Sequence, residues 1–264
     1  MQNYLPFKVE NCTPKNLLFQ LNGSEAISLP ETTPDDILQW KDIYYYIYHT
    51  PQGVIVSMKA SQQEARFFAS RNWKEIKSSL TLTNQEEKVF LNSFLRLAFG
   101  MTSTTNHKTI KLHASVIELN GKALAFMGTS GTGKSTHSRL WREFIPGCTL
   151  LNDDEPLVRI LEDGSIRVYG APWSGSTPCY RSASAELVAF VHLYQHSENK
   201  LTKLNYLQAL SSIYGSSAML RSDMTHRNAV LNVVTDILQT VPVYRLDCRP
   251  DKEAVLCTRS LLSE

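Results

Sequence analysis

Residues 128–135 have the sequence Gly128-Thr129-Ser130-Gly131-Thr132-Gly133-Lys134-Ser135. This sequence fits the pattern G-x-x-x-x-G-K-[ST], which is typical of loops that bind nucleotide phosphates. Glycine tolerates the positive φ angles that turn backbone N–H groups inward, and it leaves room for phosphate oxygens. The pattern predicts that Lys134 contacts the β- and γ-phosphates and that the hydroxyl of Ser135 binds Mg²⁺.

The residues on either side predict a strand before this loop and a helix after it. Lys122–Met127 are mostly apolar and predict a short buried strand, and the residues after Gly133 predict a helix whose positive N-terminal end faces the anion. The pair Asn120-Gly121 separates that strand from the β-rich stretch 110–119 and is a strong signal for a β-hairpin. The strand that leads into the loop therefore has an antiparallel neighbour, so we predict an α/β fold with a mixed sheet.

The pattern alone also arises by chance, but the predicted strand and helix favour a genuine nucleotide site. We therefore predict that the chain binds ATP, or another nucleoside triphosphate, together with Mg²⁺. The predicted nucleotide-binding residues are Gly128, Thr129, Ser130, Gly131, Thr132, Gly133, Lys134, Ser135 and Thr136.

Two adjacent carboxylates, Asp153 and Asp154, follow a predicted strand eighteen residues after Ser135. Proteins with such a phosphate-binding loop present a second Mg²⁺ ligand in this way, at the end of a strand. One aspartate can hold the metal while the other accepts the proton of an attacking hydroxyl, and the sequence does not decide which. The alternative is a solvated turn, which the position at a strand end disfavours.

Composition and charge limit the partners and the location of the protein. The chain has 264 residues, a net charge of +2 and no dense run of Lys or Arg, so neither nucleic acid nor a membrane surface is a predicted partner. We find no signal peptide and no apolar run approaching the roughly 20 residues of a membrane helix. The five cysteines are scattered and predict free thiols in the cytoplasm.

The pattern of elements predicts two domains, 1–106 and 107–264. The first is an N-terminal α+β module, rich in β-structure, with a hairpin around Thr50–Gly53 and an amphipathic helix that ends near Gly100. The second contains the phosphate-binding loop.

His113, fifteen positions before Gly128, completes a set of motifs with the Asn-Gly hairpin, the loop and the Asp-Asp pair. This set resembles the HPr kinase/phosphorylase superfamily, which shares its core with phosphoenolpyruvate carboxykinases. The resemblance covers roughly 107–264. It is closest to HPr-kinase-related proteins found beside peptide-modification enzymes, which similarly carry a Gly-x-Pro-Trp segment, here Gly170–Trp173, and a late Val-Tyr-Arg-Leu-like strand.

The resemblance implies a mixed-sheet core of the carboxykinase/HPr kinase type. It implies that His113 lies near the transferred phosphate, that Asp153 and Asp154 share the base and metal roles, and that Lys134 contacts the phosphates. The chain also departs from HPr kinases, which have other residues at Thr129 and Thr136. The resemblance therefore leaves the acceptor and the oligomeric state open.

Two further residues are candidates for substrate contacts. Trp173 either stacks on a substrate or a base, or anchors its loop. Arg181 is a candidate for contact with a phosphoryl group or an acidic substrate.

The sequence as a whole predicts an enzyme that transfers a phosphoryl group from ATP to a hydroxyl of a peptide or protein serine, or of a small metabolite. The alternatives are a non-catalytic nucleotide-binding regulatory module and a carboxykinase-like enzyme.

Overall fold

The computed structural model describes residues 1–13, 17–40, 42–175 and 177–262. The chain forms two compact units, which we call the N-terminal and C-terminal units. The N-terminal unit comprises Met1, Val9–Asn106 and Met219–Arg227; the C-terminal unit comprises Gln2–Lys8, His107–Ala218 and Asn228–Glu264. Chain order alone would place Gln2–Lys8 in the N-terminal unit and Met219–Arg227 in the C-terminal unit. Each segment belongs to the other unit instead.

Within the described residues, the N-terminal unit has a six-stranded sheet in the order β1-β6-β5-β4-β3-β2. The pair β1 and β6 is parallel and the other pairs are antiparallel. The predicted hairpin around Thr50–Gly53 is confirmed, because His49 pairs with Val54 across the turn. The strands are β1 (Gln20–Asn22), β2 (Asp36–Trp40), β3 (Ile43–His49), β4 (Gly53–Ala60), β5 (Gln63–Ser70) and β6 (Glu75–Ser78).

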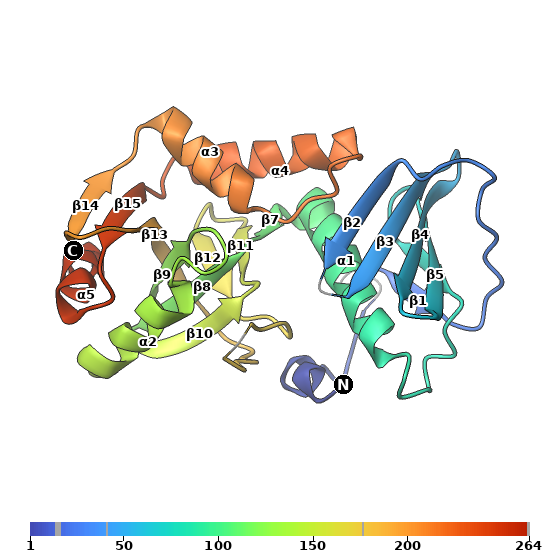
Figure 1. Ribbon diagram of the computed structural model, residues 1–264, viewed down its shortest axis with the longest axis horizontal. Coiled ribbons are helices and arrows are strands. Elements are labelled where there is room, and N and C mark those ends of the chain that lie inside the picture. The colour runs from blue at the N-terminus through green and yellow to red at the C-terminus, as the bar shows by residue number, and fades with distance from the viewer. Residues whose placement is uncertain (14–16, 41, 176, 263–264) are drawn as a thin grey trace. The chain divides into compact units, whose positions relative to one another are not determined.

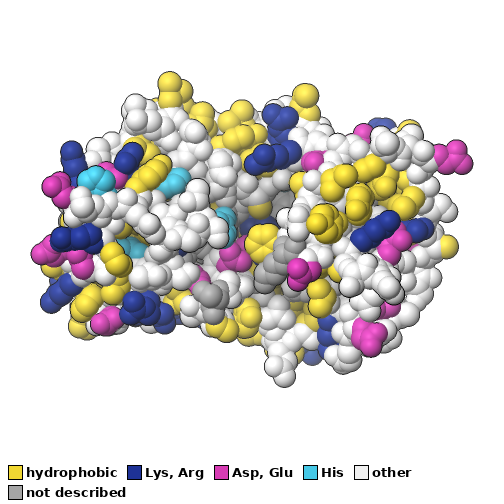
Figure 2. All heavy atoms as spheres, in the orientation of Figure 1, with side chains coloured by type: hydrophobic (Ala, Val, Ile, Leu, Met, Phe, Trp, Pro, Cys, Tyr) yellow, Lys and Arg dark blue, Asp and Glu magenta, His cyan; other side chains and the backbone are white. Residues whose placement is uncertain are grey.

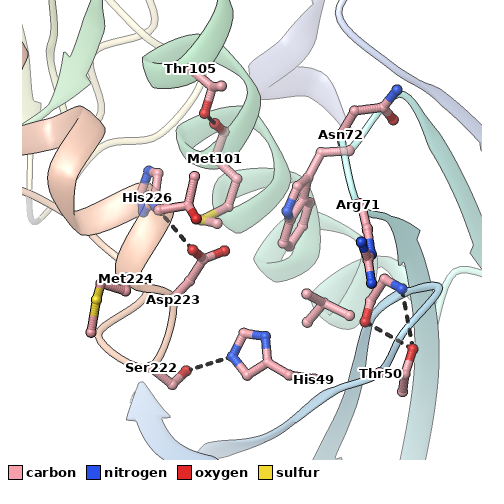
Figure 3. A pocket seen from close by; sticks show the side chains of 14 residues that line it. His49, Thr50, Arg71, Asn72, Met101, Thr105, Ser222, Asp223, Met224 and His226 are labelled. Atoms are coloured by element: carbon pink, nitrogen blue, oxygen red, sulfur yellow. Dashed lines mark hydrogen bonds between the residues drawn. The ribbon is translucent and has the colours of Figure 1, made fainter.

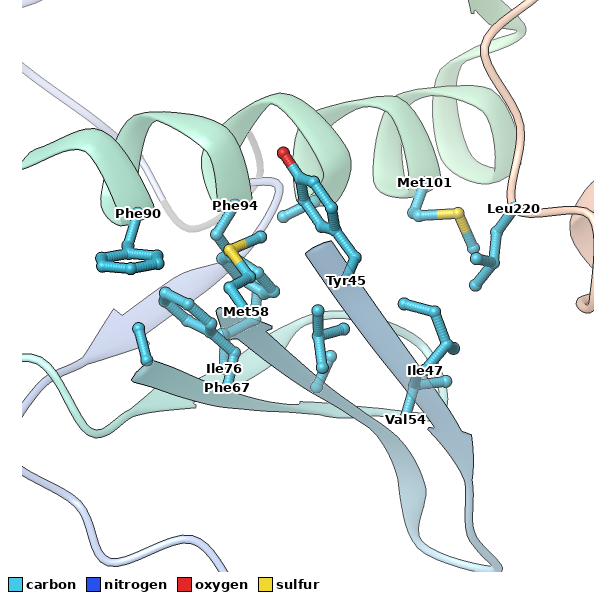
Figure 4. Packing of buried hydrophobic residues seen from close by; sticks show 14 of the residues in the cluster. Tyr45, Ile47, Val54, Met58, Phe67, Ile76, Phe90, Phe94, Met101 and Leu220 are labelled. Carbon is cyan, nitrogen blue, oxygen red and sulfur yellow. The ribbon is translucent and has the colours of Figure 1, made fainter. Parts of the chain in front are cut away.

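Helix α1 (Lys88–His107) packs on this sheet and forms the core of the N-terminal unit (Figure 4). The ring of Phe94 lies parallel to that of Phe67, with 3.9 Å between ring centroids. The predicted end of this helix at Gly100 is wrong, since the helix continues to His107. The hydroxyls of Thr102 and Thr104 donate to carbonyls one turn earlier, which lets polar residues remain inside a buried helix.

Within its described residues the C-terminal unit has a mixed nine-stranded sheet (Figure 1). Its main path runs β10-β8-β9-β13-β12-β11-β7, and β15 joins β13 to β14. The strands are β7 (Thr109–Lys111), β8 (Ala114–Leu119), β9 (Lys122–Met127), β10 (Thr149–Asp154), β11 (Leu157–Ile160), β12 (Ile166–Tyr169), β13 (Ser184–Gln195), β14 (Lys200–Lys203) and β15 (Val243–Cys248). Among the described residues, the other helices are α2 (Lys134–Phe144), α3 (Tyr206–Ser216), α4 (Met224–Ile237), α5 (Lys252–Arg259) and the 3₁₀ helices η1 (Gln2–Phe7) and η3 (Ser260–Leu262).

The predicted mixed sheet is confirmed: β9, β13 and β15 are parallel neighbours, while β8 is antiparallel to β9. Asn120 and Gly121 form the two-residue turn between β8 and β9, with φ angles of 53° and 79°. These two positive φ angles are those that a type I′ turn requires.

Helices α2 and α5 share a core with the sheet of the C-terminal unit. Trp141 is fully buried and its indole N–H donates to the hydroxyl of Thr258, 2.9 Å away. His137, one turn earlier on α2, is buried against the edge of the Phe126 ring. A titratable imidazole is thus buried, with the Phe126 ring against it and the Thr258 hydroxyl 3.4 Å from its Nε2.

This enclosure predicts a loss of stability in acid. Burial lowers the pKa of His137 to about 4, against a smaller opposing effect of Asp251. Between that value and the unfolded value of about 6.5, the unfolded chain binds more protons than the folded chain, so the free energy of unfolding rises with pH. From about pH 7.5 to about pH 5, this residue should lower the free energy of unfolding by about 2 kcal/mol. Urea unfolding followed by tryptophan fluorescence measures it. If the free energy of unfolding of His137→Gln fell by the same amount in acid, His137 would not be the residue responsible.

Two glycines offer a matched test of packing. A Cβ on Gly170 would collide with the carbonyl oxygen of Arg181, whereas within the described residues a Cβ on Gly215 would meet no atom within 4 Å outside its own helix. We expect Gly170→Ala to lower the free energy of unfolding by about 1–3 kcal/mol. Gly215→Ala, in α3, should raise it by up to about 1 kcal/mol. Urea unfolding of both variants measures these changes, and equal effects would contradict the packing at Gly170.

Within the described residues, no helix combines the length and apolar character needed to cross a membrane. On the face shown in Figure 2, Lys and Arg side chains are interspersed with Asp and Glu.

Candidate functional site

Three strands of the C-terminal unit bring the predicted site residues to one edge of the sheet. Asp154, the last residue of β10, pairs with Ala114, the first residue of β8, and Ala114 pairs with Met127, the last residue of β9. His113 directly precedes β8, and residues 128–135, which we call the glycine-rich loop, directly follow β9. Antiparallel pairing therefore aligns His113, the two aspartates and the loop, although they are far apart in sequence.

The glycine-rich loop has the backbone that its sequence predicts. Gly128, Gly131 and Gly133 have φ angles of 147°, 81° and 108°, which other residues rarely adopt. Gly133 is the N-cap of α2, so the loop ends at the positive end of a helix. A Cβ on Gly128 would lie 3.3 Å from the carbonyl oxygen of Leu193, so the loop also packs closely against β13.

Lys134 is the first residue of α2, and its ammonium group turns back toward the loop. Its Nζ donates to the carbonyl oxygens of Gly128, at 2.9 Å, and Thr129, at 3.2 Å. Burial lowers the pKa of Lys134, and the nearby carboxylates of Asp154 and Asp153 oppose this effect. The loop thus holds a buried cation beside two anions, within the pocket that the loop lines.

Asp153 accepts hydrogen bonds at both carboxylate oxygens and at its backbone carbonyl oxygen. The hydroxyl of Ser135 donates to its Oδ1 at 2.9 Å, and the backbone N–H of Thr177 donates to its Oδ2 at 3.3 Å. Its own carbonyl oxygen accepts bonds from the Ser174 hydroxyl and the Gly175 N–H. Its side chain is 2% exposed. Asp153 is therefore fixed beside the hydroxyl predicted to bind Mg²⁺.

Asp154 has different surroundings. Its Oδ1 lies 3.0 Å from Nδ1 of His113, which directly precedes the neighbouring strand β8. Its φ angle of 126° is rare for any residue other than glycine. Backbone strain of this kind persists where surrounding contacts enforce it, and it is common at functional sites. The two adjacent aspartates therefore present their carboxylates to two different partners.

The five side chains predicted for catalysis and Mg²⁺ binding line one pocket of about 310 Å³. Gly175, which the sequence did not indicate, also lines it, and a Cβ there would crowd Asp154 at 3.2 Å. The lining residues are His113, Ser130, Gly131, Gly133, Lys134, Ser135, Thr136, Asp153, Asp154 and Gly175.

The remaining predicted loop residues support the shape of the loop. The carbonyl groups of Gly128 and Thr129 receive the Lys134 ammonium. The hydroxyl of Thr132 donates to the Thr129 carbonyl oxygen at 2.7 Å and lies 2.8 Å from the Thr129 hydroxyl.

The two substrate candidates lie away from this pocket. Trp173 is 4% exposed, and its indole N–H donates to the Tyr4 hydroxyl at 2.9 Å, which favours the role of a loop anchor. Arg181 donates to the Thr149 hydroxyl and the Leu150 carbonyl oxygen at the start of β10. Asp153 lies at the opposite end of that strand. Arg181 does not line the phosphate pocket, and its contact with a phosphoryl group or an acidic substrate stays a prediction.

The sequence motifs did not indicate Asn152 as a site residue. Its buried amide donates to the Trp173 carbonyl oxygen at 2.9 Å, and its Oδ1 accepts from the Glu155 N–H at 3.0 Å. These bonds connect the end of β10 to the loop that holds Asp153. The signal in the sequence was a polar residue at the end of an apolar strand. Its bond to Trp173 could not be predicted from that signal, because Trp173 is distant in sequence.

A family model described as SynChlorMet cassette protein ScmC matches residues 76–251, which include this entire pocket. The chain belongs to the ScmC family. No curated protein matches the sequence. Among solved structures, the HPr(Ser) kinase/phosphatase from Coxiella burnetii is similar to this ScmC-family chain, with a TM-score of 0.35 and 12% sequence identity, over 58% of this chain and 87% of that one. This is a weak likeness of fold.

Proposed function

We propose that this ScmC-family protein transfers the γ-phosphoryl group of ATP, or of another nucleoside triphosphate, to a hydroxyl group. The acceptor is a serine of a peptide or protein, or a small metabolite. One observation carries the proposal: two adjacent carboxylates lie beside the same buried lysine, with Asp153 bound to Ser135 and Asp154 bound to His113. Binding a nucleotide requires one metal ligand, whereas transfer to a hydroxyl also requires a base.

Ser135 and Asp153 fit Mg²⁺, because the Ser135 hydroxyl and Asp153 Oδ1 are hard oxygen ligands only 2.9 Å apart. When bound, Mg²⁺ neutralises charge on the phosphates. The backbone N–H groups of the glycine-rich loop and the Lys134 ammonium bind phosphate oxygens and stabilise the charge that develops during transfer. For that role Lys134 exchanges its two loop carbonyls for phosphate oxygens.

Asp154 is the proposed base. It accepts the proton of the acceptor hydroxyl as the oxygen forms its bond to the γ-phosphorus and the bond from that phosphorus to the β-phosphate oxygen breaks. His113, 3.0 Å from Asp154, orients this carboxylate. Asp153 is assigned to the metal instead, because its Oδ1 lies 2.9 Å from the Ser135 hydroxyl, the other proposed Mg²⁺ ligand.

A second pocket favours a nucleotide over a simple phosphate. It has a volume of about 460 Å³ and shares Gly131, Gly133 and Thr136 with the phosphate pocket. Leu193 and Gln195 on β13 form part of its wall. Its size and apolar surface suit a nucleoside.

Transfer of the γ-phosphoryl group from radiolabelled Mg-ATP to serine-containing peptides and hydroxylated metabolites tests the proposal. Labelled acceptor with ADP as the second product is the expected result. A folded protein that binds Mg-ATP but labels no acceptor would instead be a regulatory module. A folded protein that binds no nucleotide would overturn the proposal altogether.

A further inference from the structure

The N-terminal unit contains a separate pocket of about 400 Å³, within the range of small-molecule sites. Four segments that are distant in sequence but belong to this one unit form it: the β3–β4 turn, the β5–β6 turn, α1, and residues 222–226. Within the described residues, none of the proposed phosphoryl-transfer residues lines it.

The floor of this pocket is apolar and rigid. Val54, Trp73 and Met101 are buried and line it. Trp73 has a φ angle of 58°, which is unfavourable for a bulky side chain. Its ring packs near that of Phe94, with 6.5 Å between centroids, and this packing keeps the indole in place. Trp73 therefore combines an unfavourable backbone angle with a buried side chain.

The walls carry opposite charges. Figure 3 shows Arg71 and Asp223 on opposite sides of the pocket. Within the described part of the chain, Arg71 makes no ion pair or side-chain hydrogen bond, so its guanidinium is available. Asp223 accepts the His226 N–H at Oδ1, 2.9 Å away, and among the described residues its Oδ2 has no hydrogen-bond donor.

The rest of the wall is held in position. His49 Nε2 lies 3.1 Å from the Ser222 hydroxyl, and the Thr50 hydroxyl donates to the Gly53 carbonyl oxygen at 3.0 Å. These bonds hold the β3–β4 turn and the segment that carries Asp223, and preorganisation of this kind lowers the entropic cost of binding.

We propose that this pocket binds a short zwitterion of dipeptide size. Its ammonium group contacts Asp223, its carboxylate contacts Arg71, and its apolar side chain lies over Trp73 and Met101. A cation and an anion on opposite walls favour a molecule with both charges over a phosphate or a simple amine. This site is independent of the proposed kinase activity.

Calorimetry of the full chain with L-alanyl-L-phenylalanine tests this proposal. Two analogues each lack one charge: the N-acetyl dipeptide and the C-terminal amide. Wild type should bind the dipeptide saturably and both analogues about tenfold more weakly or worse. Arg71→Gln should bind the dipeptide and its C-terminal amide with equal affinity. Asp223→Asn should bind the dipeptide and its N-acetyl form with equal affinity. Asparagine can still accept the His226 N–H, because it is also a favourable N-cap residue.

Lys74→Gln is the matched control, because Lys74 is an exposed cation next to the same turn but does not line the pocket. It should bind like wild type, and all three variants should keep wild-type affinity for Mg-ATP. The proposal fails if wild type shows no saturable binding up to about 10 mM dipeptide, or if it binds all three compounds equally. The comparison of analogues on wild type decides the proposal even if a variant misfolds.

Discussion

Replacing Lys134 with alanine is expected to reduce phosphoryl transfer by about 10³-fold and nucleotide affinity by at least about tenfold. The side chain is buried beside the loop, and its ammonium group is the cation nearest to where the phosphates would lie. No other residue can supply that charge from within the loop. Calorimetry with Mg-ATP gives the affinity, and release of ADP gives the rate.

The control for this change is Lys203→Ala, because Lys203 is an exposed lysine on β14 that does not line the phosphate pocket. It should match wild type in both measurements. Lys134→Arg should also fail, because the planar guanidinium does not fit the space of a compact ammonium group. If Lys134→Ala retained both affinity and turnover, the glycine-rich loop would not be the phosphate site.

Replacing Asp154 with asparagine is expected to lower the transfer rate by about 10²- to 10⁴-fold while leaving Mg-ATP affinity within about threefold of wild type. The amide keeps the size of the side chain but cannot accept the proton of the acceptor hydroxyl. Single-turnover transfer at saturating Mg-ATP measures the rate without a contribution from binding.

Asp153→Asn should behave differently, although it changes the neighbouring residue in the same way. Asp153 is bound to Ser135, so its loss should raise the Mg²⁺ concentration required for half-maximal activity. A magnesium titration of both variants separates the two roles. The opposite result is that Asp153→Asn abolishes transfer at every Mg²⁺ concentration, while Asp154→Asn only raises the Mg²⁺ concentration required for half-maximal activity. That result would reverse the roles of the two aspartates. If neither variant lost turnover, the base would lie elsewhere.

Features that depend on a few neighbouring residues were predictable from the sequence. Asn120-Gly121 predicts its hairpin because both residues tolerate a positive φ, and the three loop glycines have positive φ angles for the same reason. A local pattern fails where tertiary contacts override it. Helix α1 passes through Gly100 because core packing and hydroxyl-to-carbonyl bonds stabilise the residues that follow.

The sequence by itself determined the strand, the loop, the helix and the presence of two carboxylates, since each follows from backbone preferences or from residue type over short distances. Only the tertiary structure decided how these parts meet. Strand pairing placed Asp154 level with Ala114 and Met127, and so placed His113 beside Asp154 rather than Asp153. The tertiary structure also buried Trp173 and placed residues 219–227 in the N-terminal unit. Strand register and long-range packing depend on the whole chain, because each contact is stabilised by surfaces that distant segments provide.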